Sequence, residues 1–324
     1  MKKKKLKNAL LCALAVPCMF VATGCKDKVE PISANEYANL VYEAGSNYVK
    51  NHSDYKTYGD MTLNTSRTTT ASEKVKISYK ANAQATELSE KEVTITATSS
   101  GTQVIEINRD ETENGDIALK ITQTSVETEK GERANSDTDL LENYEEKEES
   151  TAVYTFVKSG EDYKLFKHIK RTTKATGEDD TSVERKEVRT FESQATFQTA
   201  IESILEEVDE DLVESMLSAS GEMMFMSPEA YKGDDKFGMT MKYTMTDNGY
   251  DGMYKTDVEY KFEFENNLPH AVNMDTKTSR MDGSTNDRNE GITITYSASA
   301  ISAPTDSADY TANNLISYDD IISD

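Results

Sequence analysis

The residue types that commonly carry out catalysis are scattered along this 324-residue chain. Its three histidines, His52, His168 and His270, lie far apart and outside the H-E-x-x-H spacing of zinc hydrolases. No serine lies in the G-x-S-x-G pattern that presents a nucleophile. Adjacent acids such as Glu206-Glu207 have the chemistry of a glycosidase pair, but such neighbours are expected by chance in an acidic chain. The sequence therefore predicts that the protein is not an enzyme.

Two oxygen-rich segments have donor atoms that suit calcium, at Asp247-Asn248-Gly249 and Asp282-Gly283. Neither has acids at alternate positions ahead of the glycine, as the EF-hand loop requires. Both are better explained as turns, because Asn-Gly and Asp-Gly favour the backbone conformations that reverse a strand. We therefore expect no metal site and no cofactor.

The remaining chemistry lies at the N-terminus, where Lys2, Lys3, Lys4, Lys5 and Lys7 precede an apolar run from Ala9 to Ala22. That run is shorter than a typical transmembrane helix and leads into Thr23-Gly24-Cys25. The segment resembles the signal peptide of bacterial lipoproteins. The resemblance implies that Cys25 is acylated through a diacylglyceryl thioether and becomes the first mature residue. It places the protein outside the cytoplasm, anchored to a bacterial membrane by lipid.

The cysteine count and the charge agree with that expectation. Cys12 and Cys18 lie in the predicted signal, so the mature chain keeps no thiol for a disulfide or a metal. The formal net charge is -23, and removal of residues 1–24, which contain five lysines and no acid, makes it -28. Such a surface repels nucleic acid phosphates and anionic headgroups, so we expect neither as a direct ligand.

Most of the mature chain shows the alternation of apolar and polar residues that is typical of antiparallel strands. A long hairpin is predicted from Phe237 to Phe264 around an Asn248-Gly249 turn, followed by strands near 271–278 and 292–296 joined at Asp282-Gly283. The first half shows shorter strands, at 75–79, 93–95, 105–107, 117–121, 152–156 and 163–169. Together they indicate roughly ten or more strands.

Two segments have helical periodicity instead. Residues 33–49 place Tyr37, Leu40, Val41 and Tyr48 on one side. Residues 193–217 repeat apolar side chains every three or four positions opposite a row of acids. Residues 125–150 have neither period, which predicts a mobile acidic loop inside the domain.

This order of a helix, strands, a central amphipathic helix and further strands ending in Ile292-Thr293-Ile294-Thr295-Tyr296 and Ala303-Pro304 resembles the unclosed β-barrel lipoprotein carriers. That group includes LolA and LolB of Gram-negative bacteria and LppX and LprG of mycobacteria. The resemblance implies a mainly β fold with some α (α+β). In it a large curved antiparallel sheet or half-barrel is covered by the N-terminal helix and the central amphipathic helix, and acyl chains lie between them.

Ten of the thirteen methionines fall between Met216 and Met281. Methionine adapts to irregular apolar ligands, so one interpretation is a lipid pocket between sheet and helices. Its candidate lining residues are Met223, Phe225, Met239, Met241, Tyr243, Met245, Tyr260 and Phe262. The other interpretation is an ordinary packed core in which methionine takes the place of leucine.

The predicted organisation is a signal peptide (1–24), a lipidated tether (25–33), a single β-rich domain (34–310) and a tail (311–324) that either docks back or stays free. The predicted function is a lipid-anchored, non-enzymatic lipoprotein that binds or carries a hydrophobic ligand such as a lipid. The alternative is a cell-surface interaction or structural lipoprotein with a packed core. The sequence does not identify a protein partner.

Overall fold

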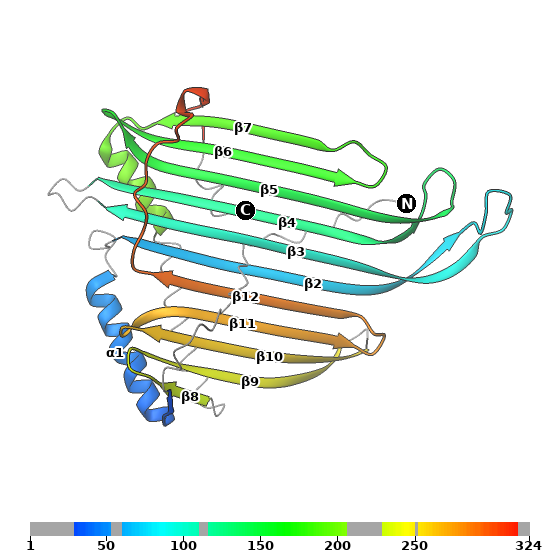
Figure 1. Cartoon of the computed structure of the whole chain (residues 1–324), viewed down its shortest axis with the longest axis horizontal. Coiled ribbons are helices and arrows are strands. Elements are labelled where there is room, and N and C mark those ends of the chain that lie inside the picture. Colours follow the sequence, from blue (N-terminus) through cyan, green and yellow to red (C-terminus); the bar gives the residue numbers. More distant parts are fainter. Residues whose placement is uncertain (1–28, 53–59, 110–115, 206–228, 250–251, 317–324) are drawn as a thin grey trace.

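A single open, curved sheet of thirteen strands makes up most of this computed structural model (Figure 1). The structure describes residues 29–52, 60–109, 116–205, 229–249 and 252–316. In that part of the chain, no helix combines the length and the apolar character needed to cross a membrane. The predicted signal peptide and Cys25 lie outside the described residues. The described residues are mostly in β-strands, as the sequence predicted, and helices make up a smaller part.

The strands follow one another mainly as neighbours. Their bounds are β1 (Glu30–Pro31), β2 (Met61–Tyr79), β3 (Ser89–Arg109), β4 (Ile117–Ala134), β5 (Leu141–Ser159), β6 (Asp162–Ala175), β7 (Thr181–Thr190), β8 (Glu229–Lys232), β9 (Lys236–Gly249), β10 (Gly252–Glu265), β11 (Leu268–Arg280), β12 (Thr285–Thr295) and β13 (Thr311–Ala312). Strands β2 to β7 form one antiparallel meander and β8 to β12 a second. Pairing of β12 with β2 joins the two meanders into one sheet.

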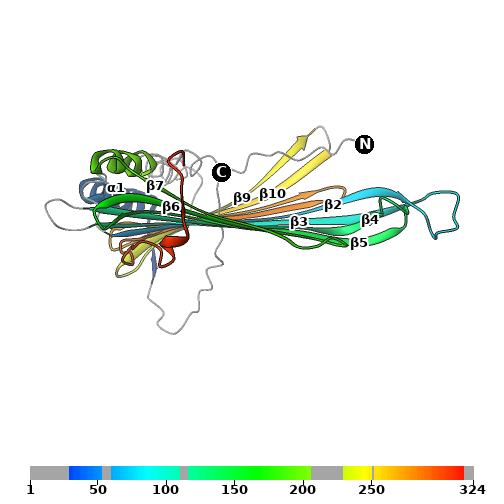
Figure 2. The same ribbon diagram turned by 90° about the horizontal axis from the view of Figure 1, so that it is seen from above.

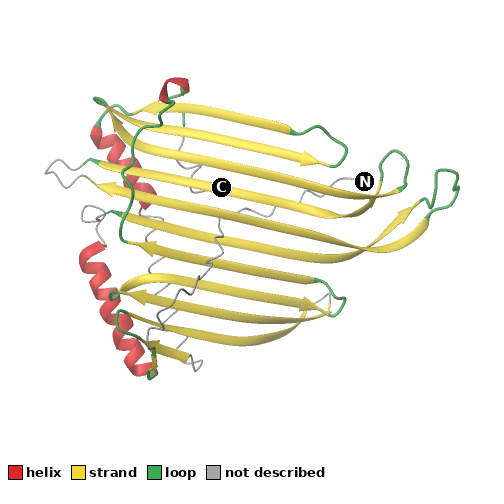
Figure 3. Cartoon of the chain, viewed as in Figure 1, coloured by secondary structure: helices red, strands yellow, loops and turns green. Residues whose placement is uncertain are grey.

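The helices among the described residues cover one face of the sheet at one end (Figures 2 and 3). Helix α1 (Ala34–His52) packs through Tyr37, Val41 and Ala44 on β8 to β11. A second helix, described over residues 194–205, packs through Phe197, Ile201 and neighbouring residues on β2 to β6. We call this side the helix face; it carries Leu63, Ile105, Ile121, Met239 and Phe262.

The opposite side, the outer face, is crossed near the same end by the chain that follows β12 (Figure 2). Tyr310 from this segment packs edge-on against Phe166, with the ring centroids 5.2 Å apart. Lys186 Nζ donates to Asp306 Oδ2 at 2.7 Å, which ties the segment to β7. The sheet therefore has a layer on each side at this end.

Over the rest of the sheet, the described part of the chain forms a single layer. Strand β3 has 21 residues, which at about 3.3 Å per residue reach roughly 70 Å, and most side chains beyond the helices are only partly buried. Polar contacts join neighbouring strands there, such as Thr102 with Thr124 at 2.6 Å and Ser125 with Ser150 at 2.8 Å. Cross-strand pairs of this kind stabilise a sheet that has little apolar packing.

This single layer corrects two predictions. Residues 125–150, predicted as an acidic loop, instead form the paired halves of β4 and β5, with only residues 135–140 between them. The separate short strands predicted at 93–95 and 105–107 are one strand, β3. Alternation of hydrophobicity requires one buried face, and within 96–104 and 125–150 only Tyr144 is buried, so the sequence signal is missing there although the strands exist.

Smaller differences concern turns and ends. Strand β9 continues through Asn248-Gly249, the predicted turn, and pairs with β10 up to Gly249 and Gly252. The predicted turn at Asp282-Gly283 is confirmed, since Gly283 has φ of 85° and Ser284 N donates to Asp282 Oδ1 at 2.8 Å. The predicted helix at 33–49 is α1, and residues 206–217 of the second predicted helix lie outside the described residues.

Both ends of the described chain join the sheet. In the predicted tether, Glu30 and Pro31 pair with β8 as β1. In the predicted tail, Thr311 and Ala312 pair with β7 as β13, and Ile316 is buried in the core. The folded unit therefore extends beyond the predicted boundaries of 34 and 310.

Substitutions in β4 test the contrast between the two ends of the sheet. We expect Leu119→Ala, at a fully buried position, to lower the free energy of unfolding by about 2–5 kcal/mol. Val126→Ala, at a half-exposed position of the same strand, should cost less than about 1 kcal/mol. Urea titration monitored by circular dichroism measures both values, and equal losses would contradict the proposed confinement of the core.

Candidate functional site on the helix face

The predicted pocket residues separate into two groups along β9 and β10. Met239 and Phe262 are fully buried and belong to the cluster that packs on Tyr37 of α1. Phe264 and Phe237 of that cluster stack with ring centroids 4.5 Å apart. These contacts are those of a filled core, the alternative that the sequence left open.

The second group continues the same face beyond α1. Tyr243 and Tyr260 are half-buried and stack with centroids 6.4 Å apart, and Met245 is 50 % exposed. Met241, opposite Tyr260, is buried. Met223 and Phe225 lie outside the described residues. The structure thus brings six of the eight candidates to one face. Along the strands, these six change from fully buried at Met239 and Phe262 to exposed at Met245.

The strand registers extend this surface across the whole sheet. Directly opposed residues form one row from β9 to β7: Met241, Tyr260, Met274, Glu290, Arg67, Gly101, Ser125, Ser150, Arg171 and Val183. Small side chains occupy the middle of this row, and arginines stand at both sides of them. Among the described residues, every member of the row except Met241 is at least partly exposed, which suits a large partner better than a small molecule, because small ligands bind in concave sites.

Arginine is distributed unequally between the two faces. By the alternation of side chains along each strand, all seven arginines with described side chains lie on the helix face: Arg67, Arg133, Arg171, Arg185, Arg189, Arg280 and Arg288. The outer face carries most strand lysines instead, among them Lys120, Lys147, Lys170, Lys186, Lys242, Lys261 and Lys277. The sequence analysis missed this segregation because it becomes visible only when the registers are known.

A charged cluster lies at the centre of the row. Glu290 forms an ion pair with Arg67, whose Nε lies 3.3 Å from Glu290 Oε1, and a second ion pair with Arg288. Arg288 Nε is buried and has no hydrogen-bond partner among the described residues. Burial first, and then the neighbouring Tyr243, raise the pKa of Tyr260. The charge of Glu290 also raises this pKa, and the charge of Arg288 lowers it. Two guanidinium groups therefore share one carboxylate beside the tyrosines.

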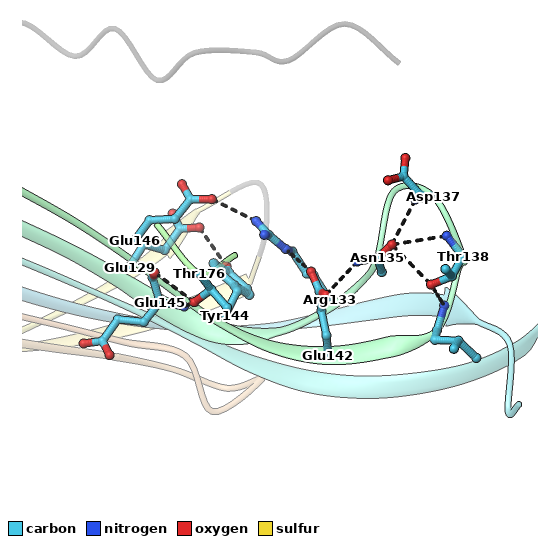
Figure 4. A network of polar contacts seen from close by, with 11 residues as sticks. Glu129, Arg133, Asn135, Asp137, Thr138, Glu142, Tyr144, Glu145, Glu146 and Thr176 are labelled. Atoms are coloured by element: carbon cyan, nitrogen blue, oxygen red, sulfur yellow. Dashed lines mark hydrogen bonds and ion pairs between the residues drawn. The ribbon is translucent and has the colours of Figure 1, made fainter. Parts of the chain in front are cut away.

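A second polar network lies at the far end of β4 and β5 (Figure 4). Arg133 Nε donates to Glu142 Oε1 at 2.9 Å, and another nitrogen of Arg133 donates to Glu146 Oε1 at 2.8 Å. The guanidinium lies 4.8 Å from the ring centroid of Tyr144, whose hydroxyl donates to Glu129 at 2.7 Å. This network holds the β4–β5 end together far from the apolar core.

The same network perturbs its ionisable groups. Hydrogen bonds from Asn135 and then Arg133 lower the pKa of the Glu142 carboxyl. Burial and then the hydrogen bond to Glu129 raise the pKa of Tyr144. Asn135 also accepts from the backbone of Asp137 and Thr138, so it organises the turn as well as the carboxylate.

Within the described ranges, no group of three or more His, Cys, Asp or Glu side chains is placed to hold a metal ion. His168 Nε2 contacts Glu184 at 2.8 Å on the outer face, and His270 Nδ1 contacts the carbonyl of Ile294 at 3.0 Å. The two histidines therefore belong to separate local contacts.

Comparison with known proteins adds little to this geometry. No family model and no curated protein matches the chain. Among solved structures, the transport unit of the autotransporter AIDA-I from Escherichia coli matches with 7% sequence identity and a TM-score of 0.21, covering 81% of this chain and 98% of that one. A likeness at that level supports no statement about fold or function.

The polar network predicts a measurable titration. We expect Asn135→Ala and Arg133→Gln each to raise the pKa of Glu142, because each removes a hydrogen bond to the ionised carboxylate. The lowered pKa of Glu142 stabilises the β4–β5 end above the ordinary glutamate pKa, and this contribution disappears as the pH falls through the lowered value. Carbon-detected NMR titration of the side-chain carboxyls measures the shift.

Lys147→Gln serves as the control, since Lys147 pairs with Glu149 rather than with Glu142. An unchanged pKa of Glu142 in both network variants would contradict the assigned contacts.

Proposed function

We propose that this protein is an extracytoplasmic, lipid-anchored, non-enzymatic lipoprotein that binds a partner protein through the uncovered part of its helix face. The observation that carries the proposal is the concentration of arginine, tyrosine and methionine on that one face. These residue types are enriched at the centres of protein interfaces, whereas lysine, which dominates the outer face, is depleted there.

The arginines have the surroundings that make such residues important in binding. Arg67 and Arg288 share Glu290, and Arg171 pairs with Glu148 at 2.5 Å. Pairing restricts the rotamers of each arginine, so less side-chain entropy is lost when a partner's carboxylate or carbonyl is bound. Neighbouring glutamates keep the face nearly balanced in charge, which favours a mixed-charge protein surface as the partner over a polyanion.

A lipid carrier is a less well supported use of this sheet. A carrier must remove acyl chains from water, which is worth about 0.8 kcal/mol for each buried methylene group. Met239 and Phe262, two of the predicted lining residues, already pack on α1. Tyr243, Met245 and Tyr260 lie on an open face, where a bound chain would remain half exposed. The carrier function therefore stays a prediction of the sequence.

The lipid anchor rests on residues 1–25 and has a direct test. Cells grown with an alkyne-labelled fatty acid should transfer the label to the wild-type protein but not to Cys25→Ser, which should leave the membrane fraction. Cys18→Ser, within the predicted signal, is the matched control and should keep the label. Label retained on Cys25→Ser would contradict lipidation at this residue.

Site-specific photo-crosslinking in intact cells tests the binding face. A photoreactive amino acid at Thr69 projects from the helix face beside Arg288, and the same group at Thr68 projects from the outer face. We expect a protein adduct from position 69 and little or none from position 68. Arg67→Ala should lower the adduct yield roughly fivefold or more, the effect of losing about 1–2 kcal/mol at an interface arginine.

Lys277→Ala, on the outer face, should leave the yield unchanged. Equal protein adducts from both faces would contradict the proposal, and lipid adducts alone from position 69 would favour the carrier function instead.

A further inference from the structure

Strand β9 has a long edge that no other strand covers within the described residues. Strand β8 pairs with only the first part of β9, and the last pair joins Glu229 to Thr240. Strand β10 pairs with β9 along its whole length, up to Gly249. Residues 241–248 therefore pair on one side only. We call this stretch the open edge.

Hydrogen bonds near the start of β9 establish which backbone groups point outward. Asp235, an odd-numbered position, accepts from Asn266 N at 2.7 Å on the β10 side, whereas Lys236 accepts from Gly233 N at 2.7 Å on the β8 side. Antiparallel strands alternate such groups residue by residue. The N–H and C=O groups of Lys242, Thr244 and Thr246 consequently point away from β10, toward the side where β8 has already ended.

The other edges of the sheet are better protected. The free side of β8 is paired with β1, and β7 at the opposite edge is met by β13. The part of β7 beyond β13 carries Glu184, Arg185 and Lys186, and charges of this kind discourage edge-to-edge pairing. The open edge has only Lys242 and Asp247 as charged residues, and they lie five positions apart.

The side chains of the open edge suit an extended polypeptide. Met241, Tyr243 and Met245 alternate on the helix face, so an added strand would continue that apolar row with its own alternate side chains. Methionine accommodates different apolar neighbours.

Charge indicates which polypeptide fits. Lys242 pairs with Glu259 at 3.1 Å and Lys255 pairs with Asp257 at 2.8 Å. Glu229 and Asp247, at the two ends of the open edge, make no ion pair with a described residue. The local excess is therefore negative, which favours a strand with lysine or arginine. A second copy of this chain fits less well, because each copy has a formal net charge of -23.

We propose that the open edge of β9 binds an extended basic segment of another protein as an added β-strand. The added strand takes the backbone hydrogen bonds that Lys242, Thr244 and Thr246 direct outward, and its cationic side chains lie near Glu229 and Asp247. This inference goes beyond the proposed function, because it concerns the edge of the sheet and does not require that the helix face bind anything.

The test uses the full mature chain and the fluorescent eight-residue peptide KTVTVTVK as the probe, because its valines share one face and its two lysines lie on opposite faces, as Glu229 and Asp247 do. We expect the peptide to bind, as followed by fluorescence anisotropy, and to slow hydrogen exchange at the amides of Lys242, Thr244 and Thr246. Thr244→Pro removes one outward N–H without breaking the pairing with β10 and should weaken binding about tenfold or more. Thr244→Ala keeps the N–H and should change affinity less than about twofold.

A second comparison does not depend on the folding of a variant. The same peptide with alternate backbone nitrogens methylated cannot donate to the edge and should bind at least tenfold more weakly, and the same peptide with glutamate in place of both lysines should also bind more weakly than the basic one. Arg67→Ala should leave peptide binding intact, so failure of the helix-face proposal and failure of this one are distinguishable.

Three results would overturn the inference. They are no measurable binding of the basic peptide, equal binding of the methylated peptide, and slow exchange of the three outward amides in the free protein. Concentration-dependent dimers in sedimentation experiments that disappear in Thr244→Pro would assign the edge to a second copy of the chain instead.

Discussion

Apolar packing at one end of the sheet is the constraint on which the rest of the structure depends. A helix on β8 to β11 and another on β2 to β6 bury two aromatic-rich clusters against the helix face. Burial of apolar surface is the dominant favourable term in folding, at roughly 25 cal/mol per Å². The far halves of β2 to β5 contribute little to that term, so their order follows from strands that are already held in register at the packed end.

The exposed halves show how a single layer is stabilised without a core. Tyr144 is largely covered by its neighbours although it lies far from both clusters, and Arg133 bridges two glutamates across its ring. Lys80 pairs with Asp139 at 2.7 Å and so joins the β2–β3 end to the β4–β5 end. Contacts of this kind are individually weak at a surface. As a network across neighbouring strands they hold the ends of the sheet in place.

The sequence predicted the packed end of the sheet better than the exposed end. Where one face is buried, as in β9 to β12 and in α1, alternation or helical periodicity identified the elements. Where almost no side chain is buried on either face, as at residues 125–134 of β4 and 141–150 of β5 apart from Tyr144, no period exists, and the strands were predicted as a loop. The candidate site divides in the same way. Six methionine and aromatic residues on one face were predicted together, but the row from Tyr260 to Arg171 depends on registers that a single sequence does not contain.

An open sheet with a filled core favours binding on its surface, and the two proposed surfaces, the helix face and the open edge of β9, meet at Met241, Tyr243 and Met245. Native mass spectrometry of residues 26–324 purified from a bacterial cytoplasm, followed by organic extraction, tests this account most directly. A filled core predicts protein without bound lipid. Lipid recovered at one molecule per chain would contradict the account and favour the lipid-carrier function.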